Sequence, residues 1–157
     1  GNGTQHAFEN DGGFFFASSH QFPFYPGTGD VGEVGRGNVH NAPLPAAAGA
    51  RAFRAAWETR LLPALAAFKP ELIIISAGFD AHRDDPLAEI HLDEDDYIWI
   101  TREIMAIADS SAGGRLISSL EGGYDLAALG RSVAAHVATL MSGGGGTGSQ
   151  ADHPGLT

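Results

Sequence analysis

Short apolar runs alternate along the chain with longer stretches in which apolar residues recur at helical spacing. Three runs have the length and composition of buried strands: residues 14–19, 72–76 and 116–120. The second run contains three consecutive isoleucines, which is typical of a strand covered on both faces. A further short strand is expected near Val39, inside a region of glycine, proline and asparagine that otherwise predicts loop.

Helical spacing of apolar residues predicts three helices, at residues 46–68, 93–112 and 126–140. Pro63 must kink or restart the first helix, because proline has no N–H to donate. Asp93 is a candidate N-cap of the second helix. Alternating strands and helices predict an α/β fold, in which a parallel sheet carries helices on its faces. Reactive groups in such a sheet lie beyond the carboxyl ends of the strands.

Length and charge exclude several classes of protein. The 157 residues are enough for one domain with its own core. A formal net charge of −10 argues against direct binding of nucleic acid and against docking on anionic membranes. No apolar run approaches the ~18 residues that a membrane span needs. The absence of cysteine excludes disulfides, thiolate zinc sites and a cysteine nucleophile, and it is compatible with the cytoplasmic location that we expect.

The two ends of the chain suggest a division into a domain and a tail. Residues 1–142 hold all the predicted elements, whereas residues 143–157 are glycine-rich and polar and are expected to form a flexible tail. The first residue is Gly1 rather than methionine, and no leader pattern follows it. We therefore expect that the chain is a portion of a longer protein.

The segment Ser76–Leu87 follows the triple-isoleucine strand and carries the first candidate for chemistry. Asp80 would lie at the carboxyl end of a buried parallel strand, where a carboxylate can bind a metal or a substrate. Gly78 permits a tight exit of the backbone. The plainer interpretation, which spacing alone favours, is that Asp80 caps a turn and that His82 is a surface histidine.

The second candidate follows the next predicted strand, in the sequence Leu-Glu-Gly-Gly-Tyr-Asp at residues 120–125. Gly122 and Gly123 let the chain turn sharply and project Tyr124 from the same edge of the sheet as Asp80. A phenol at that edge can donate a hydrogen bond to a substrate carbonyl and to the oxyanion that develops from it. The alternative is a helix-starting tyrosine packed on the core, and this segment taken alone favours that alternative.

Taken together, the segments resemble the histone deacetylase and acetylpolyamine amidohydrolase family. The resemblance rests on five stretches that occur in the family's order and at suitable intervals: Gly-Asn-Gly-Thr-Gln at 1–5, Ser-Ser-His at 18–20, Tyr-Pro-Gly-Thr-Gly at 25–29, Ser-Ala-Gly-Phe-Asp-Ala-His at 76–82 and Leu-Glu-Gly-Gly-Tyr at 120–124. The last stretch is more similar to the class II and bacterial amidohydrolase branches than to class I enzymes.

The resemblance implies a three-layer arginase-like α/β fold and zinc-dependent hydrolysis of acetylated amines. The family's zinc is held by Asp, His and Asp, and Asp80 matches the last of these ligands. Tyr124 matches the tyrosine that polarises the acetyl carbonyl. Matches to the wall of the substrate tunnel are Tyr25, Leu87, Gly122 and Gly123. The Ser18 side chain and the Ser19 backbone carbonyl match part of a structural monovalent-cation site, with K⁺ as the expected ion.

One departure from the family pattern is central. The family's other two zinc ligands and its histidine general base come from motifs that would lie before Gly1. The resemblance therefore implies the C-terminal portion of a deacetylase that acts on acetylated lysine peptides or acetylated polyamines, and the portion alone is expected to be inactive. The alternative is a non-catalytic α/β binding module that uses a deacetylase-like cleft.

Overall fold

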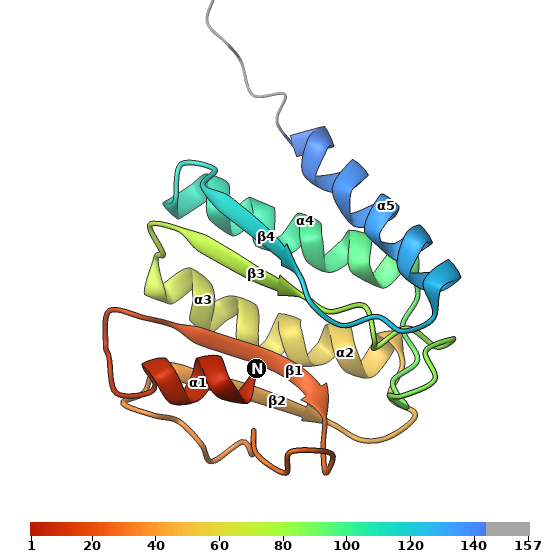
Figure 1. Cartoon of the computed structure of the whole chain (residues 1–157). Helices are drawn as coiled ribbons and strands as arrows, with labels where there is room; N and C mark the ends of the chain where they lie inside the picture. Colours follow the sequence, from red (N-terminus) through yellow and green to blue (C-terminus); the bar gives the residue numbers. More distant parts are fainter. Residues whose placement is uncertain (144–157) are drawn as a thin grey trace, which may run out of the picture.

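The computed structural model describes residues 1–143, and its four strands form two parallel pairs. The first pair is β1 (Phe16–Gln21) with β2 (Val39–Leu44), and the second is β3 (Ile73–Ala77) with β4 (Leu116–Leu120). All four strands point the same way, so the loops that follow them gather at one edge (Figure 1). β1 and β3 are the inner strands of the row, and no ladder joins them within residues 1–143.

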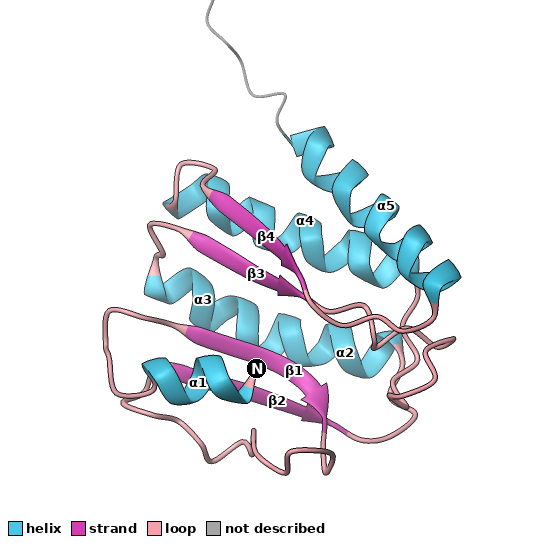
Figure 2. Cartoon of the chain, viewed as in Figure 1, coloured by secondary structure: helices cyan, strands magenta, loops and turns pink. Residues whose placement is uncertain are grey.

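Most of the helices lie on one face of the strands (Figure 2). That layer consists of α2 (Ala50–Ala56), a π-helical segment η1 (Trp57–Leu61), α3 (Leu62–Phe68), α4 (Glu94–Ser111) and α5 (Leu126–Gly143). The short α1 (Asn2–Phe8) lies on the opposite face, against β1. The expected α/β fold class with parallel strands and helices on both faces is confirmed, although the described strands form two pairs rather than one continuous sheet.

A shared core joins the two strand pairs. Buried side chains at the end of β2, on α2, at the end of β3 and on α4 form one cluster: Leu44, Ala48, Phe53, Ala77, Phe79, Ile90, Leu92 and Tyr97. A second cluster packs α3 and α4 against β3. Because the core spans both pairs, the loops at the carboxyl edge are held in one arrangement.

Local sequence signals explain where α4 begins and where the helix that starts with α2 is interrupted before Pro63. Asp93 caps α4 as predicted: its side chain accepts the Asp95 N–H, and Asp96 reaches back to the Asp93 N–H to complete a capping box. The predicted restart at Pro63 is also present. The Leu62 N–H bonds to the Trp57 carbonyl five residues back, which makes a π-helical turn just before the proline.

One face of the second strand pair is bare within the described chain, which corrects the expectation for the triple isoleucine. Ile73 is buried and Ile75 is half-buried against the helices, but the side chain of Ile74 is 64% exposed. Ile117, its neighbour on β4, is 53% exposed. No described element covers these side chains, because the helices that follow β3 and β4 both return to the other face.

The predicted division into a domain and a flexible tail stays a prediction, because all of the tail except its first residue lies outside the described part of the chain. Gly143 is the last residue of α5, and residues 144–157 lie outside the described part of the chain. None of the helices in residues 1–143 is long and apolar enough to cross a bilayer. The cytoplasmic location stays a prediction.

Candidate functional site

The loops that follow β3 and β4 run side by side at the carboxyl edge. The Glu121 N–H donates to the Ala77 carbonyl at 3.0 Å, and the Phe79 N–H donates to the Gly122 carbonyl at 2.7 Å. These two hydrogen bonds extend the pairing of the strands into the loops. The structure therefore brings together the two segments that the sequence singled out.

Asp80 lies directly against Gly122. A Cβ atom built on Gly122 would be 2.7 Å from the Asp80 Cγ and under 3.0 Å from both carboxylate oxygens. Gly78 also approaches the same carboxylate, since its Cβ would be 2.9 Å from Oδ1. Burial raises the pKa of the Asp80 carboxyl, and the nearby Asp85 carboxylate adds to that shift. A half-buried carboxylate in a glycine cradle at a strand end is suited to hold a cation, which would favour its charged form.

We expect Gly122→Ala to destabilise the chain, because the added methyl group would occupy the space of the Asp80 carboxylate. Overpacking costs about 1–3 kcal/mol in the free energy of unfolding, and we expect the lower end of that range because the clash falls on the end of the Asp80 side chain. The matched control is Gly130→Ala on α5, where no atom lies within 4 Å of the new Cβ and helix propensity favours alanine. Urea unfolding of both variants measures the difference.

The same clash can be tested by removing its other partner. In an Asp80→Ala background the carboxylate is gone, so Gly122→Ala should cost much less there than in the parent chain. Equal costs in both backgrounds would show that Asp80 does not lie on Gly122.

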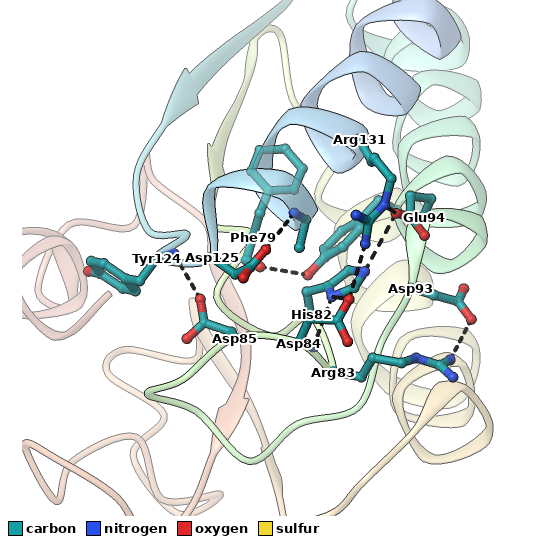
Figure 3. A network of polar contacts seen from close by, with 12 residues as sticks. Phe79, His82, Arg83, Asp84, Asp85, Asp93, Glu94, Tyr124, Asp125 and Arg131 are labelled. Atoms are coloured by element: carbon teal, nitrogen blue, oxygen red, sulfur yellow. Dashed lines mark hydrogen bonds and ion pairs between the residues drawn. The ribbon is translucent and has the colours of Figure 1, made fainter.

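Tyr124 projects from the edge rather than packing on the core. Its side chain is 56% exposed, and its ring points away from α4 and α5 (Figure 3). The Tyr124 N–H donates to Asp85 Oδ2 at 2.8 Å, and the next residue, Asp125, accepts the Ala128 N–H at the start of α5. The core-packing alternative is therefore wrong, and the phenol is free to meet a bound molecule.

The loop after Asp80 is tied to the helices by polar contacts that sequence reasoning missed. His82 is only 2% exposed, so the expectation of a surface histidine is wrong. Its Nδ1 accepts the Asp84 N–H at 3.0 Å, which leaves the hydrogen on Nε2, 3.6 Å from Glu94 Oε1. Arg131 on α5 bonds to both Glu94 and Asp84 and lowers the pKa of Glu94 (Figure 3). These contacts hold the loop against α4 and α5.

A buried tyrosine supports the loop from behind. Tyr97 on α4 donates its hydroxyl hydrogen to the Phe79 carbonyl at 3.2 Å, and the two rings meet edge to face. Burial raises the pKa of the Tyr97 phenol far above its usual value, so the hydroxyl keeps its hydrogen. The residue just before Asp80 is thereby fixed to α4.

Two of the expected tunnel residues are exposed at the same edge. The side chain of Leu87 is 58% exposed, and that of Tyr25, in the loop after β1, is 91% exposed. Two residues beyond Leu87, the Glu89 N–H donates to the side chain of Gln21 at the end of β1. This contact brings the loop after β3 to the end of the first strand pair. Within residues 1–143, neither Tyr25 nor Leu87 forms a hydrogen bond with Asp80, and their place in a tunnel stays a prediction.

Ser18 and Ser19 lie on β1, in the other strand pair from Asp80. His20 Nε2 lies 3.0 Å from the Gly29 carbonyl, which can only accept, so Nδ1 accepts a hydrogen from the Ser18 hydroxyl at 3.0 Å. Burial lowers the pKa of His20, which is consistent with this neutral form. The Ser18 oxygen keeps its lone pairs for a cation, whereas the Ser19 hydroxyl already accepts a hydrogen bond from Trp57.

Residues 1–143 contain no group of three or more His, Cys, Asp or Glu side chains that converge to hold a metal. A catalytic zinc takes about three protein ligands. Asp80 fits as one of them by its chemistry and its place, and the described residues do not complete the set.

The sequence of the chain matches a known protein family over most of its length. The chain belongs to the histone deacetylase domain family, whose pattern matches residues 1–140. It is 40% identical over 158 aligned residues to histone deacetylase 14, chloroplastic, of Arabidopsis thaliana, which covers 98% of this chain and 37% of that protein. It is also 40% identical to the histone deacetylase-like amidohydrolase of Pseudomonas aeruginosa, over 79% of this chain and 34% of the relative.

Solved structures show the same fold. The crystal structure of the HDA15 HD domain superposes with a TM-score of 0.84 and 35% sequence identity, over 90% of this chain and 41% of that one. The structure of the histone deacetylase Clr3 gives the same TM-score at 33% identity. The deacetylase-like fold is therefore confirmed, and the chain spans well under half the length of these relatives.

Proposed function

We propose that this chain is the C-terminal portion of a zinc-dependent deacetylase and that it supplies one zinc ligand, Asp80, and the oxyanion-stabilising Tyr124. The observation that carries the proposal is the contact of the Asp80 carboxylate with Gly122, two residues before Tyr124. The Asp80 carboxylate and the Tyr124 phenol lie on adjacent loops at the carboxyl edge of parallel strands, where α/β proteins bind their ligands, and this arrangement supports the two proposed roles.

Three observations support a larger catalytic domain around the chain. The inner edges of β1 and β3 are not paired with each other, and Ile74 and Ile117 are exposed on a face that no described element covers. Unpaired strand edges and apolar faces are normally covered in stable proteins. The relatives are more than twice as long as the part that this chain matches. A preceding segment would supply the missing zinc ligands, the histidine base and the missing cover.

Two residues of this chain, Asp80 and Tyr124, are assigned a direct part in the chemistry. Zinc, when bound, lowers the pKa of a coordinated water and polarises the amide carbonyl. Asp80 would hold the metal through a carboxylate already placed by Gly78 and Gly122. Tyr124 would donate its phenolic hydrogen to the substrate's carbonyl oxygen as negative charge develops there. Because the hydroxyl reaches outward from the loop, it can meet a substrate without a rearrangement of the core.

The proposed substrates are acetylated lysine peptides or acetylated polyamines. The relatives' names, histone deacetylase and amidohydrolase, support an amide-cleaving reaction on acetylated amines. Tyr25 and Leu87, with Gly122 and Gly123, would line the approach of the acetylated chain, since both large side chains are exposed at the correct edge. Ser18 and the Ser19 carbonyl would help to bind a structural K⁺ ion, at a site separate from the one where the reaction takes place.

The test compares the chain alone with the complete catalytic domain, meaning the chain preceded by the segment that carries the other ligands. The chain alone should bind zinc weakly and should hydrolyse neither an acetyl-lysine peptide nor an acetylpolyamine, because one carboxylate cannot hold a catalytic zinc. The complete domain should hydrolyse at least one of them. Zinc titration and an acetate-release assay on both proteins measure this. A complete domain that binds the acetylated ligands without hydrolysing them would favour the non-catalytic binding module.

A further inference from the structure

Tyr124 has no side-chain anchor in the described structure. Its ring is exposed and takes part in no aromatic pair, and its hydroxyl forms no hydrogen bond with residues 1–143. The two residues before it are glycines, and Gly123 has a φ of +144°, which few other residues adopt. Because neither the ring nor the hydroxyl of Tyr124 is held, the place where the hydroxyl meets a substrate depends on how the Tyr124 backbone is fixed.

The constraint that the structure offers is the carboxylate of Asp85. This residue is only 8% exposed, and its two oxygens accept different backbone hydrogens. Oδ2 accepts the Tyr124 N–H at 2.8 Å, and Oδ1 accepts the Leu87 N–H at 2.9 Å. Hydrogen bonds to a charged acceptor are stronger than those between neutral groups. One side chain therefore joins the loop after β3 to the loop after β4 (Figure 3).

We infer that Asp85 is a positioning residue for the reaction, which fixes the backbone of Tyr124 relative to Asp80 and Leu87. The effect of Asp85 on catalysis rests on the proposed function. The placement of the Tyr124 backbone by Asp85 concerns this chain alone. Asp85 does not touch the substrate in this account. It acts through the Tyr124 N–H. Gly122, in the same loop as Tyr124, already lies against Asp80.

Asp85→Asn should break one of the two hydrogen bonds and keep the other. Asparagine has the same shape, but it has one acceptor oxygen and an NH₂ group, so it cannot accept both backbone hydrogens. The local bond to Leu87 spans only two residues, whereas the bond to Tyr124 joins residues 39 apart in the sequence. The asparagine oxygen should keep the local partner, and the Tyr124 N–H should be the one that is lost.

Amide hydrogen exchange on the 157-residue chain tests the geometry without any activity. In the parent chain the Tyr124 N–H should exchange slowly despite its place on an exposed loop. Asp85→Asn should speed exchange at Tyr124 by about tenfold or more, given the strength of hydrogen bonds to charged acceptors. The control is Asp84→Asn, which makes the same change in the adjacent aspartate, whose exposed carboxylate contacts Arg131 and the edge of His82 but not Tyr124. It should leave exchange at Tyr124 unchanged.

Kinetics of the complete catalytic domain test the consequence. Asp85→Asn should lower kcat by about tenfold or more with little change in KM and with zinc content retained. In a Tyr124→Phe background the same change should have no further effect on kcat, because Asp85 acts through the missing hydroxyl. A general disturbance of the fold would lower the remaining rate in both backgrounds.

The outcomes separate this inference from the proposed function. A complete domain without deacetylase activity would contradict the proposed function, while the exchange experiment would still decide the role of Asp85 in placing Tyr124. Rapid exchange of the Tyr124 N–H in the parent chain would overturn the inference, and this measurement does not depend on any variant that might fail to fold. An active domain in which Asp85→Asn leaves kcat unchanged would overturn it as well.

Discussion

Replacing Asp80 with alanine in the complete catalytic domain should remove both bound zinc and deacetylase activity. The carboxylate is the one zinc ligand that we assign to this chain, and Gly78 and Gly122 lie directly against it. Residues that only support a metal ligand cost about 10–100-fold in affinity or activity when they are replaced. Loss of a ligand itself should exceed that range. Metal analysis and an acetate-release assay on the purified variant measure the two effects.

Asp84→Ala is the matched control for this experiment. It removes a carboxylate from the same loop, but that side chain is exposed and contacts only Arg131 and the edge of His82. Zinc content should stay at the level of the parent protein. Stoichiometric zinc and full activity in Asp80→Ala would refute the assignment of Asp80 as a ligand.

Tyr124→Phe should lower kcat by ~10²–10³, the usual cost of removing one oxyanion donor. The ring remains, and the backbone bond to Asp85 is unaffected because it uses the Tyr124 N–H rather than the side chain. Zinc content and the unfolding temperature should therefore be unchanged. Steady-state kinetics with an acetyl-lysine peptide give kcat and KM separately. A kcat equal to that of the parent domain would mean that the phenol does not stabilise the oxyanion.

Three of the four strands were predictable because each overlaps a short apolar run between turn residues. The run at 116–120 coincides with β4, and the other two are displaced by one or two residues from β3 and β1. What the runs could not show is which face would be covered. Ile74 is as apolar as its neighbours, yet it is exposed, because burial depends on elements that must pack there and not on the strand itself.

α1 was not predicted, because its sequence has no apolar stripe. The helix buries a polar residue instead, and that burial depends on distant partners. The Gln5 side chain donates to Glu33 at 2.6 Å and accepts a hydrogen from Asn41 at 2.9 Å. Both partners lie more than 25 residues away in the sequence. Hydrophobic periodicity cannot detect an element that is held by such contacts.

The candidate site also contains residues that could be predicted from the sequence and residues that could not. Asp80 and Tyr124 could be proposed from the sequence, because each follows an apolar run with a glycine that shapes the exit from the strand. Asp85 and Tyr97 could not, since their roles depend on how two loops and a helix meet. The expectation of a surface histidine at residue 82 is wrong for the same reason. The burial of His82 depends on how the loop packs next to Glu94 of α4, and no local pattern encodes it.

The most direct test of the account is the metal dependence of hydrolysis by the complete catalytic domain. Acetate release from an acetyl-lysine peptide and an acetylpolyamine would be measured before chelation, after removal of the metal, and after one equivalent of zinc is returned. We predict that hydrolysis of at least one substrate is lost with the metal, returns with zinc, and does not return in the Asp80→Ala variant. Hydrolysis that survives full removal of the metal, or a zinc-loaded domain that releases no acetate, would contradict the claim that this chain is part of a zinc-dependent deacetylase.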